Sequence, residues 1–312
     1  MRSPENNLDS FRGSKNLEIK RKFILAFEGY RTEVQYFQGV NDHRSTLGIP
    51  SLIEVYPLCR FPTQSGCSSP GKVLDILEEY IAFLKCEKYS INLFINTFIN
   101  DMITEKQIPE SNDKIEEFLK VAKECLLPIS DEKELIKDSI KAKEKCLEVY
   151  YKIFGDSGNV IFDIPAPIDY REGHDVVCVV IDRDKESRSS SECDDFLIRC
   201  RKNGFDPYMT NPCFEMWLLI HFDEVFSENV EDLRHNKKTN DIRYTEKRLD
   251  EILKNLPANN GNGYLKNNLN FYDFIDRIND AIKNERCFCN DIKFLKTNVG
   301  SNIGQLIEKM KS

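Results

Sequence analysis

The chain has 312 residues, 40% of them hydrophobic and 31% charged, a composition typical of a globular protein that can bury a large core. No apolar run reaches the roughly 18 residues that a membrane span needs, and the polar segment Met1–Lys22 lacks the apolar part of a signal peptide. The net charge of −8 argues against a protein that coats nucleic acid through bulk electrostatics, but it leaves open an enzyme that acts on nucleic acid through a bound metal.

The cysteine pattern indicates the redox state of the compartment. The eleven cysteines are scattered and form no CxxC pair, and the CxC of Cys287 and Cys289 has no companion pair that would suggest a zinc site. Free thiols in a reducing compartment explain this usage. We therefore expect a cytoplasmic protein without membrane contact.

The chain begins with a polar stretch, residues 1–20, that is predicted to be a flexible leader because no apolar period appears in it. The first element is the apolar run Lys22–Phe27, which ends at Glu28 and Gly29 and precedes apolar residues at helical spacing. The pattern predicts a strand, a tight turn and a helix with Thr32 as its N-cap.

A second strand is predicted at Ser51–Leu58, and an amphipathic helix at Lys72–Leu84. This strand–helix order favours a parallel sheet flanked by helices. Residues 87–155 break the order, with charged helical stretches near Asn112–Leu127 and Asp131–Phe154. We interpret them as a helical insertion packed on one edge of the sheet.

The next strand carries the most informative motif. Six apolar residues, Val176–Ile181, end in Asp182-Arg183-Asp184, and such a β-branched run is typical of a strand buried on both faces. Side chains alternate along a strand, so Asp182 and Asp184 should project to the same side. Two neighbouring carboxylates repel one another unless a cation or a proton lies between them. One hypothesis is a divalent-metal site on the rim of the sheet; the other is that Asp182 caps a turn and Asp184 is solvated.

Beyond this strand we predict a helix over Glu192–Asn203 and a short strand over Phe205–Met209. The segment Asn211–Phe222 opens with an Asn-Pro pair, which predicts a helix capped by the Asn with Pro at its first position. That helix is apolar nearly all round and should be buried. Glu215 within it is costly unless it meets a metal, a cation or a good hydrogen-bond donor.

The remaining chain is polar and helical, with an Asn/Gly loop at residues 257–263 and helices at Phe271–Ile282 and Ile303–Met310. The expected fold class is α/β, a mostly parallel central sheet flanked by helices. The expected parts are an α/β core (21–86 and 156–225), a helical insertion (87–155) and a helical C-terminal region packed on the core (226–312).

Carboxylates at two strand ends suggest a shared site. Parallel sheets place their sites beyond the carboxyl ends of the strands, above all where the strand order reverses. Glu28, Asp182 and Asp184 are therefore the predicted catalytic residues and metal ligands, for Mg²⁺ or Mn²⁺, although Glu28 could instead be the general acid or base. Such a site can activate a water and stabilise charge on a phosphodiester.

Other residues are weaker candidates. Glu33 is expected mainly to hold the first helix. Glu215 either completes the acidic cluster or accepts donors from the turn at residues 28–32. His221 points about 120° away from Glu215 around the helix, so a structural hydrogen bond is its expected role. Four cationic side chains near the rim could bind substrate phosphates, although such residues are common on any surface: Lys72, Arg183, Lys185 and Arg188.

Three ordered blocks resemble the RloB-like family, bacterial proteins associated with abortive infection. Residues 27–37, containing Glu28, Gly29, Thr32 and Glu33, resemble the family's EGxxTExxYF signature. Residues 181–184 resemble its strand-terminal DxD, and residues 211–222 resemble its NPcFExWLLLHF block.

The resemblance implies a Toprim-like fold, in which a first-strand Glu and a later DxD bind Mg²⁺. It also implies a metal-dependent endonuclease in anti-phage defence, acting on RNA (tRNA among the candidates) or DNA, often beside an ABC-type or AAA-type ATPase. Two alternatives stay open at this point. The chain could be a regulatory subunit that binds the ATPase or a nucleotide without performing chemistry. It could also be a phosphotransferase, although it lacks the GxxxxGK[ST] phosphate loop of an NTPase.

Overall fold

The computed structural model describes most of the chain. The described residues are 21–29, 31–50, 53–58, 70–86, 88–104, 107–109, 113–155, 162, 170–183, 189–259 and 261–312. The predicted leader, Asp184, Lys185 and Arg188 lie outside them.

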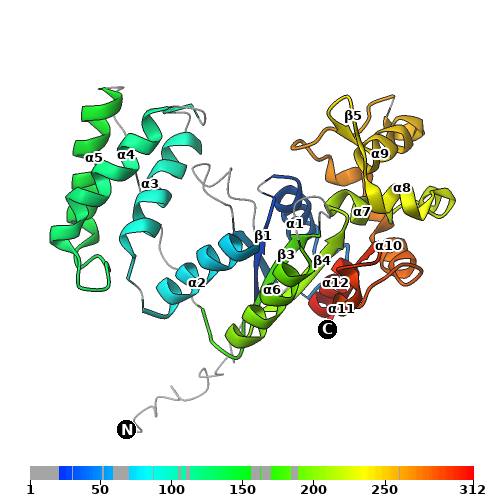
Figure 1. The fold of residues 1–312 in the computed structure, drawn as a ribbon, viewed down its shortest axis with the longest axis horizontal. Coiled ribbons are helices and arrows are strands. Elements are labelled where there is room, and N and C mark those ends of the chain that lie inside the picture. The colour runs from blue at the N-terminus through cyan, green and yellow to red at the C-terminus, as the bar shows by residue number, and fades with distance from the viewer. Residues whose placement is uncertain are drawn as a thin grey trace, which may run out of the picture.

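A mostly parallel sheet forms the centre of the molecule (Figure 1). The strands lie in the order β2 (Ile53–Leu58), β1 (Arg21–Phe27), β3 (Val176–Asp182) and β4 (Asp206–Asn211), all parallel. The two-residue β7 (Gly300–Ser301) adds an antiparallel edge next to β4. Because the chain passes from β1 to β2 on one side and then to β3 on the other, the strand order reverses between β1 and β3.

Helices cover both faces of this sheet. The helices of the first half are α1 (Thr32–Asp42), α2 (Pro70–Cys86), α3 (Ile91–Thr104), α4 (Lys114–Leu126), α5 (Ser139–Phe154) and α6 (Ser190–Asn203). Those of the second half are α7 (Phe214–Leu219), α8 (Val230–His235), α9 (Tyr244–Asn255), α10 (Ile278–Glu285), α11 (Ile292–Leu295) and α12 (Ile303–Lys311), with a small hairpin of β5 (Lys238–Thr239) and β6 (Ile242–Arg243). The α/β fold class is confirmed.

The alternation along β1 and β3 divides the core in two. Phe23, Leu25 and Phe27 join one apolar cluster with α1, α7, α9, α10 and α12, whereas Ile24 and Ala26 join a second cluster with α2 to α6. In β3 the even-numbered residues face the first cluster, so the last residue of that strand, Asp182, belongs by alternation to the side of α1 and α7. Figure 1 shows α3 to α5 at one end of the molecule and α8 to α10 at the other. The division into core, insertion and C-terminal region stays a prediction.

Three helix starts differ from the predictions. α7 begins at Phe214, because Asn211 is the last residue of β4, the Asn211–Pro212 peptide is cis and Cys213 is the N-cap. α5 begins at Ser139, after Asp138 caps it through the N–H of Lys141, since the residues before it form isolated bridges instead. The region of the predicted helix 271–282 opens with two 3-10 turns, and α10 follows only at Ile278.

Other features agree with the sequence. α6 is closed by a capping box between Ser189 and Glu192 and ends at Gly204 in the left-handed conformation. Among the residues that the structure describes, eight cysteines are free thiols, as expected. Among the described residues, no helix is long and apolar enough to cross a membrane.

Candidate functional site

The ends of β1 and β3 are joined by a carboxylate. Glu28 follows directly on β1, and its Oε2 accepts a hydrogen bond from the backbone N–H of Asp182, 3.1 Å away. The N–H of Glu28 in turn donates to the carbonyl of Val180 at 3.1 Å, which continues the β1–β3 ladder. The carboxylate of Glu28 therefore contacts the backbone of Asp182 at the point where the strand order reverses. Such a switch point is the usual place for a ligand in an open α/β sheet.

Asp182 is held by the neighbouring strand. Its Oδ1 accepts a hydrogen bond from the hydroxyl of Thr210, 2.7 Å away, and the register pairs these two residues across β3 and β4. Burial raises the pKa of Asp182 well above its ordinary value, and the negative charges of Glu33 and Glu215 raise it further. The bond from Thr210 and the charge of Lys266 act in the opposite direction without cancelling the rise. Burial and the neighbouring carboxylates therefore both favour the protonated form of Asp182.

Glu33 shapes the turn after β1. Its Oε1 accepts a hydrogen bond from the N–H of Gly29, 3.1 Å away, and its side chain is buried. A Cβ at Gly29 would overlap the carboxylate of Glu33, so a larger residue there would displace this carboxylate from the N–H that it accepts. Glu33 thus holds the backbone of Gly29 in place. Thr32 is the first residue of α1 rather than its N-cap.

Glu215 receives its donors from the C-terminal region. The hydroxyl of Tyr264 donates to its Oε1 at 3.0 Å, and Nζ of Lys266 lies 3.8 Å from the same oxygen. Lys266 also forms an ion pair with Glu246. Burial alone would lower the pKa of Lys266, but the carboxylates of Glu215 and Glu246 outweigh it and raise the pKa above its ordinary value.

The carboxylate oxygens of this site are suitable ligands for a hard divalent cation. Carboxylate oxygens are the ligands that Mg²⁺ prefers, and the mutual repulsion felt by Asp182 is what a cation would relieve. Within the part of the chain that the structure describes, no three His, Cys, Asp or Glu side chains are arranged as one metal-binding group. Asp184, the third predicted ligand, lies outside that part.

A comparison with known families decides the identity of the chain. A model of the RloB-like protein family matches residues 23–310, nearly the whole length. The chain belongs to the RloB-like protein family. No curated protein and no solved structure matches it.

The three RloB-like blocks meet around this site. The first supplies Glu28, Gly29 and Glu33 at the end of β1, the second supplies Asp182 at the end of β3, and the third supplies Glu215 in α7. Segments that are far apart in the sequence are thus brought together by the register of the parallel strands.

The third RloB-like block also contains His221, which is fully buried among aromatic rings. Its Nδ1 lies 2.9 Å from the carbonyl of Trp217, and its Nε2 lies 3.1 Å from the hydroxyl of Tyr36. Burial lowers its pKa to about 3. The expected structural hydrogen bond is present, and His221 makes it away from the acidic side chains.

The cationic candidates differ in placement. Arg183 is buried, and its Nε donates to the carbonyl of Lys296 at 2.7 Å, so this guanidinium group fastens the loop before β7 to the end of β3. Lys72 is exposed on the first turn of α2.

Sequence reasoning missed Thr210, Tyr264 and Lys266. Thr210 meets Asp182 only through the register of β3 and β4, which no local sequence pattern reports. Tyr264 and Lys266 follow an Asn/Gly loop about eighty positions beyond Asp182, and no local pattern connects that loop with the strand ends.

Proposed function

We propose that the chain is a metal-dependent nuclease that hydrolyses phosphodiester bonds of RNA or DNA, and that it acts in anti-phage defence. The observation that supports this most directly is the junction of Glu28 and Asp182 at the switch point of a parallel sheet, with two further carboxylates beside it. The strand order and the positions of these acidic residues also support a Toprim-like fold.

In this proposal Glu28 and Asp182 hold the ion together with Asp184. A bound Mg²⁺ or Mn²⁺ would supply the activation of a water and the stabilisation of charge at the phosphodiester. Thr210 fixes the orientation of the Asp182 carboxylate, and the backbone N–H of Asp182 fixes that of Glu28. Glu33 keeps the turn at Gly29 tight, so that α1 starts beside the site.

Lys266 contributes positive charge next to this acidic surface. Its side chain is about half exposed, with a relative accessibility of 52%, although its Nζ is engaged by Glu246. A cation at this position can offset part of the repulsion between substrate phosphates and the carboxylates. The expected partners remain a nucleic acid substrate and an ATPase of the ABC or AAA type.

The test is cleavage of labelled RNA and single-stranded DNA with Mg²⁺ or Mn²⁺, and with chelator, by the wild type and Asp182→Asn. Wild type is expected to cleave only with metal, and Asp182→Asn is expected to lose cleavage while keeping its melting temperature. Asp206→Asn is the matched control, because Asp206 lies at the opposite end of the neighbouring strand and pairs with Lys309. Metal-independent cleavage, or equal cleavage by Asp182→Asn, would contradict the proposal.

A further inference from the structure

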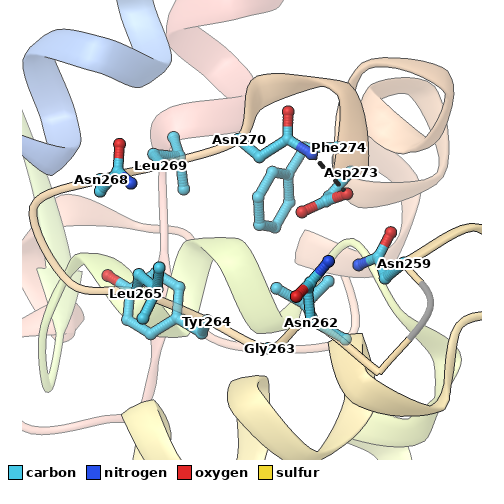
Figure 2. A pocket seen from close by; sticks show the side chains of 11 residues that line it. Asn259, Asn262, Gly263, Tyr264, Leu265, Asn268, Leu269, Asn270, Asp273 and Phe274 are labelled. Atoms are coloured by element: carbon cyan, nitrogen blue, oxygen red, sulfur yellow. Dashed lines mark hydrogen bonds between the residues drawn. The ribbon is translucent and has the colours of Figure 1, made fainter.

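A cavity of about 450 Å³ lies next to the acidic site, in the C-terminal region (Figure 2). One wall is the segment from Asn262 to Leu265, and the other is the segment from Asn268 to Phe274. In Figure 2 the side chains of Asn259, Asn262 and Asp273 converge at one end of the space between these walls. The volume lies within the range of about 300–1,000 Å³ that small-molecule sites occupy.

The lining favours a neutral ligand with several hydrogen-bond donors and acceptors. Four asparagine amides and one carboxylate provide the polar atoms, and the eleven lining residues include no lysine, arginine or histidine. Asp273 accepts a hydrogen bond from the amide of Asn270 at 3.0 Å, and the amide of Asn259 also bonds to it. A phosphate would meet this carboxylate without a compensating cation from the lining, so the pocket disfavours phosphate. An amide can both donate and accept, which suits a heterocyclic base edge.

Apolar groups complete the pocket. Leu253, Leu269 and Phe274 form part of its lining, and Leu265 stands at the rim with 62% of its surface exposed. A planar base can pack its faces against such side chains while its edge meets the polar end. The wall from Asn262 to Leu265 approaches α9 closely at Gly263, where a Cβ would overlap the carboxylate of Asp250 on that helix.

The pocket is tied to the acidic site through shared residues. Tyr264 lines the pocket, and its hydroxyl donates to Glu215. The same loop is fastened to α1: the N–H of Leu269 donates to Gln35 Oε1 at 2.8 Å, and Gln35 Nε2 donates to the carbonyl of Asn267 at 3.2 Å. The N–H of Asn267 reaches the hydroxyl of Thr32 at 3.4 Å. A ligand in the pocket is therefore held at a fixed position relative to α1 and α7.

We infer that this pocket binds an unpaired nucleobase of the nucleic acid whose backbone lies on the acidic site, with Asp273 accepting from the amino group of the base. The inference rests on the proposed function, and it names the substrate as a single-stranded or unpaired segment. In a duplex the Watson–Crick edge is occupied and stacked, so a base must leave the helix before it can enter. Adenine, cytosine and guanine carry an exocyclic amino group that can donate to Asp273, whereas uracil carries none.

The test is fluorescence anisotropy with labelled RNA homopolymers of about 12 nucleotides, oligo(rA), oligo(rC) and oligo(rU), and with an RNA duplex, all in chelator so that no cleavage occurs. Wild type is expected to bind oligo(rA) and oligo(rC) more tightly than oligo(rU) or the duplex. Asp273→Asn is expected to weaken oligo(rA) and oligo(rC) about tenfold and to change oligo(rU) little.

Two further variants make the outcome decisive. Asn262 is exposed, so Asn262→Ala is expected to keep the melting temperature while weakening oligo(rA) binding. Glu148→Gln is the matched control, an exposed carboxylate on α5 that pairs with Lys145 outside the pocket, and it should bind as the wild type does. No binding of any oligonucleotide, equal binding of oligo(rU), equal binding of the duplex, or wild-type binding by both pocket variants would each overturn the inference.

The assay separates this inference from the proposed function. Asp182→Asn is expected to lose cleavage but to keep the base preference in chelator. Base-selective binding without cleavage by the wild type would refute the nuclease and leave the pocket standing. Metal-dependent cleavage without base-selective binding would support the nuclease and refute the base-binding pocket.

Discussion

Oε2 of Glu28 lies 3.1 Å from the backbone nitrogen of Asp182, so a carboxylate from the end of β1 is held by the end of β3. This contact crosses the position where the strand order reverses, and it places two acidic side chains on the same rim of the sheet. The carboxylates of Glu33 and Glu215 act electrostatically on Asp182 from α1 and α7. The organisation of the site follows from this one junction.

Thr210→Val should weaken metal binding at neutral pH. The hydroxyl of Thr210 stabilises the charged form of Asp182, so its removal raises the pKa of that carboxyl further. A metal requires the deprotonated ligand, so the midpoint of Mn²⁺ binding against pH should move upward. Calorimetric titration with Mn²⁺ at several pH values measures this shift. Thr239→Val, in the exposed hairpin, is the control; an unchanged midpoint for Thr210→Val would contradict the role of the hydroxyl.

Gly29→Ala should disturb the turn between β1 and α1. The added Cβ would overlap the carboxylate of Glu33, so either the turn or the side chain must move. We expect a loss of about 1–3 kcal/mol in the free energy of unfolding, the usual range for a buried polar group that loses its hydrogen bond. Chemical denaturation measures this loss. Gly71→Ala is the matched control, since a Cβ there meets no atom within 4 Å. Equal stability of the two variants would show that the turn does not depend on this close approach.

His221 should stay neutral from pH 5 to pH 8, since burial lowers its pKa to about 3. The carbonyl of Trp217 can only accept, so the proton sits on Nδ1 and Nε2 accepts from the hydroxyl of Tyr36. Long-range nitrogen–proton NMR correlation should show this single tautomer throughout the range. A titration near the ordinary histidine value would restore His221 as a candidate acid or base.

Glu285 should make the protein less stable as the pH rises. Burial raises the pKa of Glu285 to about 8, although hydrogen bonds from Gly304 and Ser301 favour the charged form. The folded state then keeps a proton that the unfolded state releases, so stability falls between about pH 4.5 and pH 8, by at most about 1.4 kcal/mol per pH unit for this group. Glu285→Gln can still accept from the N–H of Gly304 and should flatten this slope. Denaturation of both proteins at pH 5.5 and pH 8 provides the comparison; parallel changes would exclude the assignment.

Much of the α/β core could be predicted from the sequence, because its strands are continuous apolar runs with clear ends. Glu28 and Asp182 could be brought together because parallel strands share one carboxyl edge. The start of α7 could not be predicted, since the Asn-Pro pair that resembles a helix start belongs to the end of β4. Lys266 and Tyr264 could not be placed either, because their contacts with Glu215 depend on how the C-terminal region folds back onto α7.

The most direct test of the proposed site is a crystal soaked in Mn²⁺, with data collected at a wavelength where manganese scatters anomalously. The proposed site predicts one anomalous peak at coordination distance from the carboxylates of Glu28 and Asp182, with Asp184 as the third ligand, and no such peak in Asp182→Asn. The absence of an anomalous peak next to these carboxylates at saturating Mn²⁺ would contradict the proposed site.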